Sequence, residues 1–162
     1  MPLDHYSTLI DANALVSQQP YNSTSKPSDV QVAAVIESVA MRIDATLANI
    51  GYVVPIVGGT KTLALLREAC TWGTVGLAQQ MRATALSATL ATSDKPLKNI
   101  WLVMFDEWMA RLINPNDPFE LPDAQRTSAQ VEKDAELVAN SSVQTIDDSN
   151  WLTPTVTRAQ VL

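Results

Sequence analysis

The sequence predicts an all-α protein: a small antiparallel bundle of about four helices, followed by an extended C-terminal tail. Apolar residues recur at helical spacing over several segments, and stretches rich in Pro, Gly, Ser and Asn separate these segments. The helical pattern weakens after residue 122. We therefore expect a helical domain over 1–122, and an acidic segment with an extended arm over 123–162.

The first predicted helix is short and covers residues 7–17. Leu9, Ile10 and Ala14 fall on one side of it, and we expect this side to face the core. A proline, an asparagine and several serines then indicate a loop over residues 19–25.

The second helix has the clearest start. Ser28 precedes Gln31 by three residues, which is the spacing of a capping box, so we expect a helix over residues 28–50. A single apolar stripe follows this helix and consists of Val32, Ile36, Val39, Ile43, Leu47 and Ile50.

A structural corner is predicted directly after the second helix. Gly51 can adopt the left-handed conformation that ends a helix, and Tyr52 stands where a residue often packs back on the last turn. Pro55 favours an extended conformation for Val54, so we expect a straight exit from the corner. The corner would orient the second helix against the third.

The third helix is predicted over residues 60–84. Gly73 and Gly76 lower its helix propensity but allow a second helix to approach closely, so we expect a tight crossing. The stretch 83–91 fits either a longer helix or a loop. The apolar stripe of this helix consists of Leu63, Leu66, Cys70, Leu77 and Met81.

The fourth helix is the most aromatic. We expect it to begin at Pro96, because proline is favoured at the first helical position, and to stop before Asn114 and Pro115. Its broad apolar face consists of Leu97, Ile100, Trp101, Met104, Phe105, Trp108, Leu112 and Ile113.

The composition favours a component of an assembly. Apolar residues make up 46% of the chain and charged residues only 17%, against about 25% in an average globular domain. Much of the surface must therefore be neutral or apolar, and exposed apolar patches usually mark contacts with partners.

The net charge of −6 is concentrated in one segment. Residues 114–150 hold eight acidic residues against two basic ones, so the rest of the chain is neutral. Without a basic stripe, binding of nucleic acid through its phosphates is disfavoured. The single cysteine excludes an intrachain disulfide, and we expect neither a membrane span nor an export signal.

Residues that could catalyse a reaction are few and scattered. His5 is the only histidine, and Cys70 lies on an apolar stripe where a small core residue is expected. The stretch Gly58–Thr62 lacks the glycine that a phosphate-binding loop has before its lysine. Asp106 and Glu107 would point about 100° apart on a helix. We therefore expect no enzyme activity, no cofactor and no metal site.

One pattern runs from the second helix through the corner into the third. The run Arg42–Leu47 precedes Gly51–Tyr52 and Pro55–Ile56, and then comes a helix with Leu66, Ala69 and Cys70. This pattern resembles the head–tail connector (adaptor, or head-completion) proteins of tailed bacteriophages. In that family a helix with an Ile-Asp-x-x-Leu element ends in an aromatic-x-x-Pro corner, and a Leu- and Ala-rich helix packs back. The likeness covers about residues 3–115.

The resemblance implies a structural virion protein of the phage neck, assembled in the host cytoplasm. Such proteins form a ring, usually of twelve subunits, that binds the portal protein, extends the DNA channel and offers a surface to the next tail component. DNA is only passing cargo, and no membrane is involved. By the same analogy the C-terminal arm would contact a partner through Trp151, Leu152, Val156 and Val161.

Two other interpretations stay open at this point. The chain could be another neck or tail-completion protein of the same kind of virion. A small helical protein of DNA packaging or regulation would need a basic recognition helix, and none of the predicted helices is strongly basic.

Overall fold

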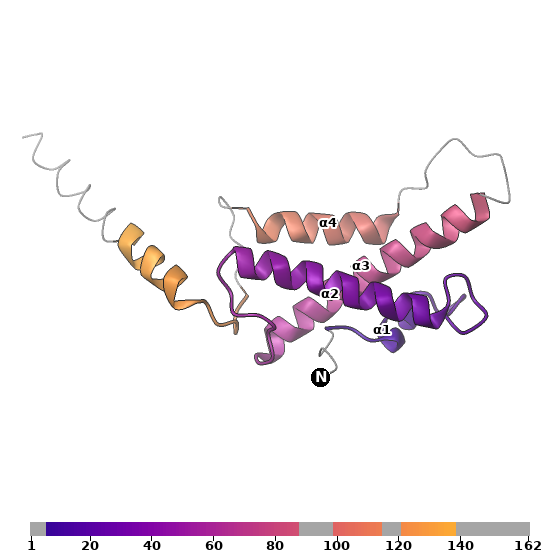
Figure 1. The fold of residues 1–162 in the computed structure, drawn as a ribbon, viewed down its shortest axis with the longest axis horizontal. Helices are drawn as coiled ribbons and strands as arrows, with labels where there is room; N and C mark the ends of the chain where they lie inside the picture. Colours follow the sequence, from indigo (N-terminus) through magenta and orange to yellow (C-terminus); the bar gives the residue numbers. More distant parts are fainter. Residues whose placement is uncertain (1–5, 88–98, 115–120, 139–162) are drawn as a thin grey trace, which may run out of the picture. The chain divides into compact units, whose positions relative to one another are not determined.

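A computed structural model of the chain describes residues 6–87, 99–114 and 121–138. It confirms the all-α prediction, because the regular structure within these residues is helical and no strand is formed. Figure 1 shows the labelled helices α1 to α4. The chain divides into two compact units, Met1–Gln125 and Arg126–Leu162. The domain boundary predicted between residues 122 and 123 stays a prediction.

Helix α1 spans Leu9–Leu15 and is shorter than predicted. It begins with a capping box between Thr8 and Asp11. Its inner side consists of Leu9, Ala12 and Val16, whereas Ile10 is 81% exposed. The predicted orientation was therefore wrong for Ile10 and for Ala14, which is also exposed, because over only two turns several apolar spacings fit a helix equally well.

Helix α2 spans Asp29–Asn49 and confirms the predicted second helix. Ser28 and Gln31 form the predicted capping box: Ser28 N–H donates to Gln31 Oε1 at 2.9 Å, and Gln31 N–H donates to Ser28 Oγ at 3.4 Å. The predicted stripe is buried over its whole length, except that Ile50, the C-cap residue, is half-buried. This face forms one wall of the core.

Helix α3 spans Thr60–Ser87 and contacts α1, α2 and α4, so it is the central helix of the first unit (Figure 1). The helix includes the beginning of the ambiguous stretch 83–91, whose remainder lies outside the described residues. Met81 was predicted on the core side but is 38% exposed; Ala78, one turn earlier, is still buried.

Helix α4 spans Ile100–Leu112, with Asn99 as its N-cap. The predicted start at Pro96 was therefore wrong; Pro96 and Leu97 lie outside the described residues. The Asn99 side chain accepts a hydrogen bond from Leu102 N–H and donates one to the Gly76 carbonyl at 2.6 Å. Ile100, predicted on the apolar face, is 63% exposed, since it is the first residue after the cap.

The crossing of α3 and α4 confirms the predicted role of the two glycines. A Cβ atom at Gly76 would lie 2.8 Å from the backbone nitrogen of Leu102. At Gly73 it would lie 2.8 Å from Cγ1 of Val39 on α2 and 3.1 Å from the Phe105 ring on α4. Only glycine permits this approach, so the two positions let α3 pack closely against both neighbours.

The second unit contains a helix over residues 128–138, within the acidic segment that showed only weak periodicity. The Asp134 carboxylate accepts hydrogen bonds from Arg126 Nη1 at 2.8 Å and from Gln130 Nε2 at 2.9 Å. No helix among the described residues has both the length and the apolar character that a membrane crossing requires.

Candidate functional site

The predicted corner forms a complete Schellman motif at the end of α2. Gly51 has a φ of 89°, and its N–H donates to the carbonyl of Ala48 at 3.1 Å. Tyr52 N–H donates to the carbonyl of Leu47 at 2.9 Å, and the Tyr52 side chain is buried. These two bonds satisfy carbonyls that the helix leaves open at its last turn. The predicted roles of Gly51 and Tyr52 are confirmed.

The exit from the corner differs from the prediction at Pro55. The chain bends at Val54 and Pro55 instead of running straight, and the Val54–Pro55 peptide bond is cis. The bend brings Ile56 into the core and directs the chain towards the start of α3. Pro55 therefore belongs to the corner, but as part of a second turn.

Tyr6 braces this corner from the other side. Its hydroxyl donates to Oδ1 of Asp44 on α2 and accepts a hydrogen bond from the backbone N–H of Ile56 at 3.1 Å. Burial raises the pKa of Tyr6, and the hydrogen bond to Asp44 raises it further. Burial also raises the pKa of Asp44, against the opposing effect of the Tyr6 hydroxyl. One side chain thus ties α2 to the segment that leads into α3.

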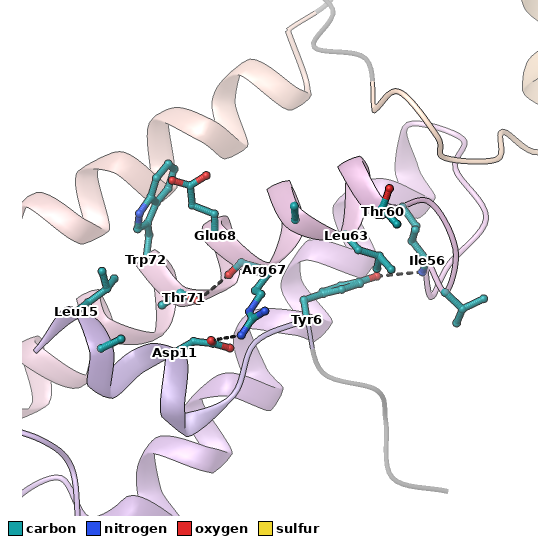
Figure 2. A pocket seen from close by; sticks show the side chains of 13 residues that line it. Tyr6, Asp11, Leu15, Ile56, Thr60, Leu63, Arg67, Glu68, Thr71 and Trp72 are labelled. Carbon is teal, nitrogen blue, oxygen red and sulfur yellow. Dashed lines mark hydrogen bonds and ion pairs between the residues drawn. The ribbon is translucent and has the colours of Figure 1, made fainter. Parts of the chain in front are cut away.

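A groove lies between α1, the corner and the N-terminal half of α3 (Figure 2). Its volume is about 800 Å³, and apolar side chains make up most of its wall. Tyr6 and Ile56 form one end, and Trp72 contributes from α3 near the other. Leu15 and Leu63 line its sides. The sequence does not reveal this groove, because its walls come from segments that are distant along the chain.

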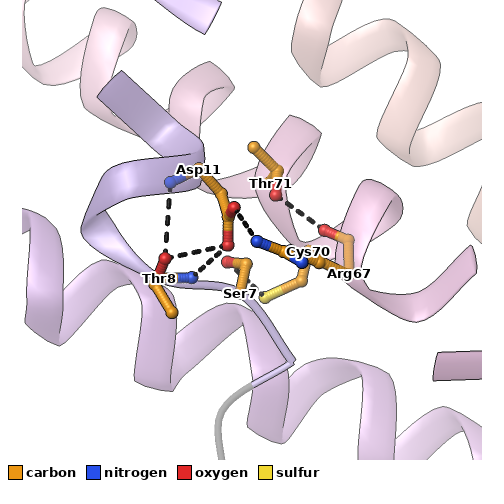
Figure 3. Close-up of polar contacts among 6 residues, drawn as sticks. All are labelled: Ser7, Thr8, Asp11, Arg67, Cys70 and Thr71. Carbon is orange, nitrogen blue, oxygen red and sulfur yellow. Dashed lines mark hydrogen bonds and ion pairs between the residues drawn. The ribbon is translucent and has the colours of Figure 1, made fainter. Parts of the chain in front are cut away.

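An ion pair stands at the edge of the groove. Asp11 caps α1 by accepting hydrogen bonds from Thr8 N–H at 2.8 Å and from the Thr8 hydroxyl at 2.9 Å, and its second oxygen pairs with Arg67 of α3 (Figure 3). The hydrogen bond from Arg67 lowers the pKa of Asp11. Asp11 therefore stays ionised while it joins α1 to α3.

Cys70 lies behind this ion pair and is fully buried. The Ser7 hydroxyl donates to its sulfur at 3.4 Å (Figure 3). Burial raises the pKa of the thiol, so the reactive thiolate form is disfavoured. This environment agrees with the interpretation of Cys70 as a core residue.

The start of α3 is occupied by a carboxylate. Asp123 Oδ2 accepts a hydrogen bond from Lys61 N–H at 3.3 Å, and Asp123 N–H donates to the Thr62 hydroxyl at 3.2 Å. Its side chain packs on Gly59, where an added Cβ would come within 2.5 Å of the Asp123 Cβ. An acidic side chain here would repel a phosphate, so this turn does not form a phosphate-binding loop.

His5 and the four residues proposed for partner contact lie outside the described residues. These four are Trp151, Leu152, Val156 and Val161. Asp106 of α4 lies 3.5 Å from Arg42 of α2 in an exposed ion pair. Within the described ranges, no three His, Cys, Asp or Glu side chains gather closely enough to hold a metal ion.

Comparisons of the chain with protein families, with curated proteins and with solved structures gave no significant match.

Proposed function

We propose that this chain is a structural subunit of a bacteriophage head–tail connector. It would form a ring, usually of twelve copies in such proteins, between the portal and the tail, and would extend the channel through which DNA passes. The first unit would be an antiparallel helical bundle, and residues 141–162 would form an extended C-terminal arm.

The corner between α2 and α3 is the observation that carries this proposal. The residues that bear the likeness to connectors act on the helix geometry: Gly51 and Tyr52 end α2, and Asp44 receives the Tyr6 brace. Ile43 and Leu47 are fully buried on the same helix. A rigid angle between two long helices is useful in a building block that repeats around a ring.

Exposed apolar side chains add support. Within the described residues they include Ile10, Val30, Met41, Val57, Ile100 and Ile113. Their distribution over α1, α2, the corner and α4 suits a subunit that has neighbours on more than one side.

The acidic segment and the arm would have separate tasks in this ring. Acidic residues near a channel would repel the phosphates of DNA and let it slide. Trp151, Leu152, Val156 and Val161 would anchor the arm on the portal as an added strand or a docked peptide.

Binding to the portal protein of the same genome tests the proposal. Full-length protein and a variant that lacks residues 141–162 are each mixed with purified portal rings, and electron microscopy counts the portals that carry an added ring. We expect occupied portals with the full chain and bare portals with the truncated one, while circular dichroism shows nearly equal helix content.

A paired substitution within the arm sharpens this experiment. Trp151→Ala with Leu152→Ala removes two proposed anchors, whereas Gln144→Ala with Thr145→Ala changes the same arm at residues not proposed as anchors. If the full chain leaves the portals bare but binds an assembled neck, the chain is a later neck or tail-completion protein. If the truncated chain still occupies the portals, the role of the arm is refuted.

A further inference from the structure

Residues 121–125 form a short segment, here called the strap, that comes after α4 in the chain and contacts the corner. Leu121 is buried in the core, and its N–H donates to the Tyr52 hydroxyl at 3.4 Å. At the end of the strap, the Gln125 carbonyl accepts a hydrogen bond from Val53 N–H at 2.9 Å. Both ends of the strap are therefore fastened just after the end of α2.

The middle of the strap contacts the start of α3. Asp123 Oδ2 accepts a hydrogen bond from Lys61 N–H, and Asp123 N–H donates to the hydroxyl of Thr62, which is fully buried. Gly59 leaves room for this contact, because its φ is 87° and an added Cβ would lie 3.0 Å from the Asp123 carbonyl oxygen. The strap thus joins both ends of the connection between α2 and α3.

The strap is compact and buries little of itself. A turn brings its residues together, and within this turn Ala124 N–H donates to the Leu121 carbonyl at 3.3 Å. Leu121 is the buried residue of the strap, whereas Pro122, Asp123 and Gln125 are exposed. A segment with so few buried side chains opens more easily than a helical core, and a tight turn can move as one piece.

The helices can keep their own contacts when the strap leaves. Helix α3 contacts α1, α2 and α4 directly, and Leu63 N–H donates to the Gly59 carbonyl at 2.9 Å without the strap. Lys61 N–H belongs to the first turn of α3, whose N–H groups have no partner inside the helix, so water can replace Asp123 there. Val53 is 47% exposed, so water can also reach its N–H once the strap has left.

We propose that the strap is a latch, which opens as one unit while the helices of the first unit stay folded. When closed, it fastens Gln125, after which the second unit begins, to both ends of the connection between α2 and α3. A partner that binds residues 126–162 differently in the two states therefore shifts the latch between them. The inference does not rest on the proposed function.

Two substitutions weaken the latch from opposite sides. Leu121→Ala removes the buried side chain of the strap, and Thr62→Val removes the hydroxyl of α3 that accepts the Asp123 N–H. The matched controls are Gln125→Ala, whose contact with the corner uses the backbone carbonyl, and Thr84→Val at an exposed position of α3. Circular dichroism checks that each variant keeps the helix content of its control.

Native-state hydrogen exchange, followed by NMR on the full-length protein in low concentrations of urea, measures how often the latch opens. The N–H groups of Val53 and Lys61 report on the strap, and that of Ile43 in α2 reports on the core. We expect the two strap reporters to share one free energy of opening and one urea dependence, both smaller than those of the core reporter. Both should exchange about fivefold faster in Thr62→Val and at least about tenfold faster in Leu121→Ala, with the controls unchanged.

Three outcomes would overturn the inference. In the first, the two strap reporters differ in their free energy of opening or in their urea dependence, so the strap is not one unit. In the second, both match the core reporter, so the strap opens only when the helices unfold. In the third, a substitution speeds exchange at one strap reporter alone, or at neither by more than its control does.

Discussion

Replacement of Gly76 by alanine tests the close crossing of α3 and α4. The added Cβ would lie 2.8 Å from the backbone nitrogen of Leu102, 3.0 Å from its Cα and 3.1 Å from its Cβ. Backbone atoms cannot rotate away as a flexible side chain can, so α4 must shift as a whole. The same shift would strain the hydrogen bond from Asn99 Nδ2 to the Gly76 carbonyl, which joins the start of α4 to α3.

The expected loss of folding stability combines one stabilising effect with two destabilising effects. Alanine is favoured over glycine inside a helix by about 1 kcal/mol. Overpacking of a close contact costs about 1–3 kcal/mol, and loss of the Asn99 hydrogen bond costs about 1 kcal/mol. The net destabilisation is therefore about 1–3 kcal/mol. For a chain of this size it corresponds to a fall in Tm of roughly 3–10 °C.

Urea and thermal unfolding, followed by circular dichroism, measure this change. Gly58→Ala is the matched control, since no atom lies within 4 Å of its added Cβ and its backbone is not left-handed. That control should be neutral or stabilising by up to about 1 kcal/mol. A Gly76→Ala protein that is as stable as the parent, or more stable, would refute the close crossing.

Two further predictions concern the polar contacts of the N-terminal region. Tyr6→Phe removes the hydroxyl that joins Asp44 to Ile56 and leaves the buried Ile56 N–H unpaired, so urea unfolding should show a loss of about 1–3 kcal/mol; an unchanged midpoint would contradict the brace. Asp11 has a lowered pKa in the folded state because of Arg67, so its contribution to stability is present above the unfolded pKa of about 3.9 and is lost as pH falls through the folded pKa. Asp11→Asn should therefore reduce stability at pH 7 and flatten the loss between about pH 5 and pH 2; parallel curves for the two proteins would show that the ion pair contributes nothing.

The predictions of helix ends and buried faces were most accurate where residues close together in the sequence determine the structure. The capping box at Ser28 and the Schellman glycine at Gly51 act within a few residues of themselves, and both ends of α2 were correct. The buried stripe of α2 was correct because five turns leave only one face that fits its apolar spacing. In α1, which has only two turns, the apolar spacing does not determine which face is buried, so Ile10 was wrongly placed on the core side.

The groove could not be predicted because its parts meet only through the tertiary fold. Asp11 pairs with Arg67 across 56 positions, and Asp123 binds the start of α3 across about 60. The start of α4 was misplaced because Asn99, which caps the helix, is held by a hydrogen bond to the Gly76 carbonyl of α3, and the local sequence does not reveal this contact. Both features depend on contacts between segments that are distant along the chain, and the spacing of nearby residues does not reveal such contacts.

The brace at Tyr6 also sets an order of events during synthesis of the chain. Tyr6 leaves the ribosome before its partners Asp44 and Ile56 have been made. Asp11 can likewise form its ion pair only after Arg67 has been made. Helix α1 has only seven residues, too few to persist alone in water. Helix α1 is thus fixed later than its place in the chain suggests, because it docks only after α3 has been made as far as Arg67.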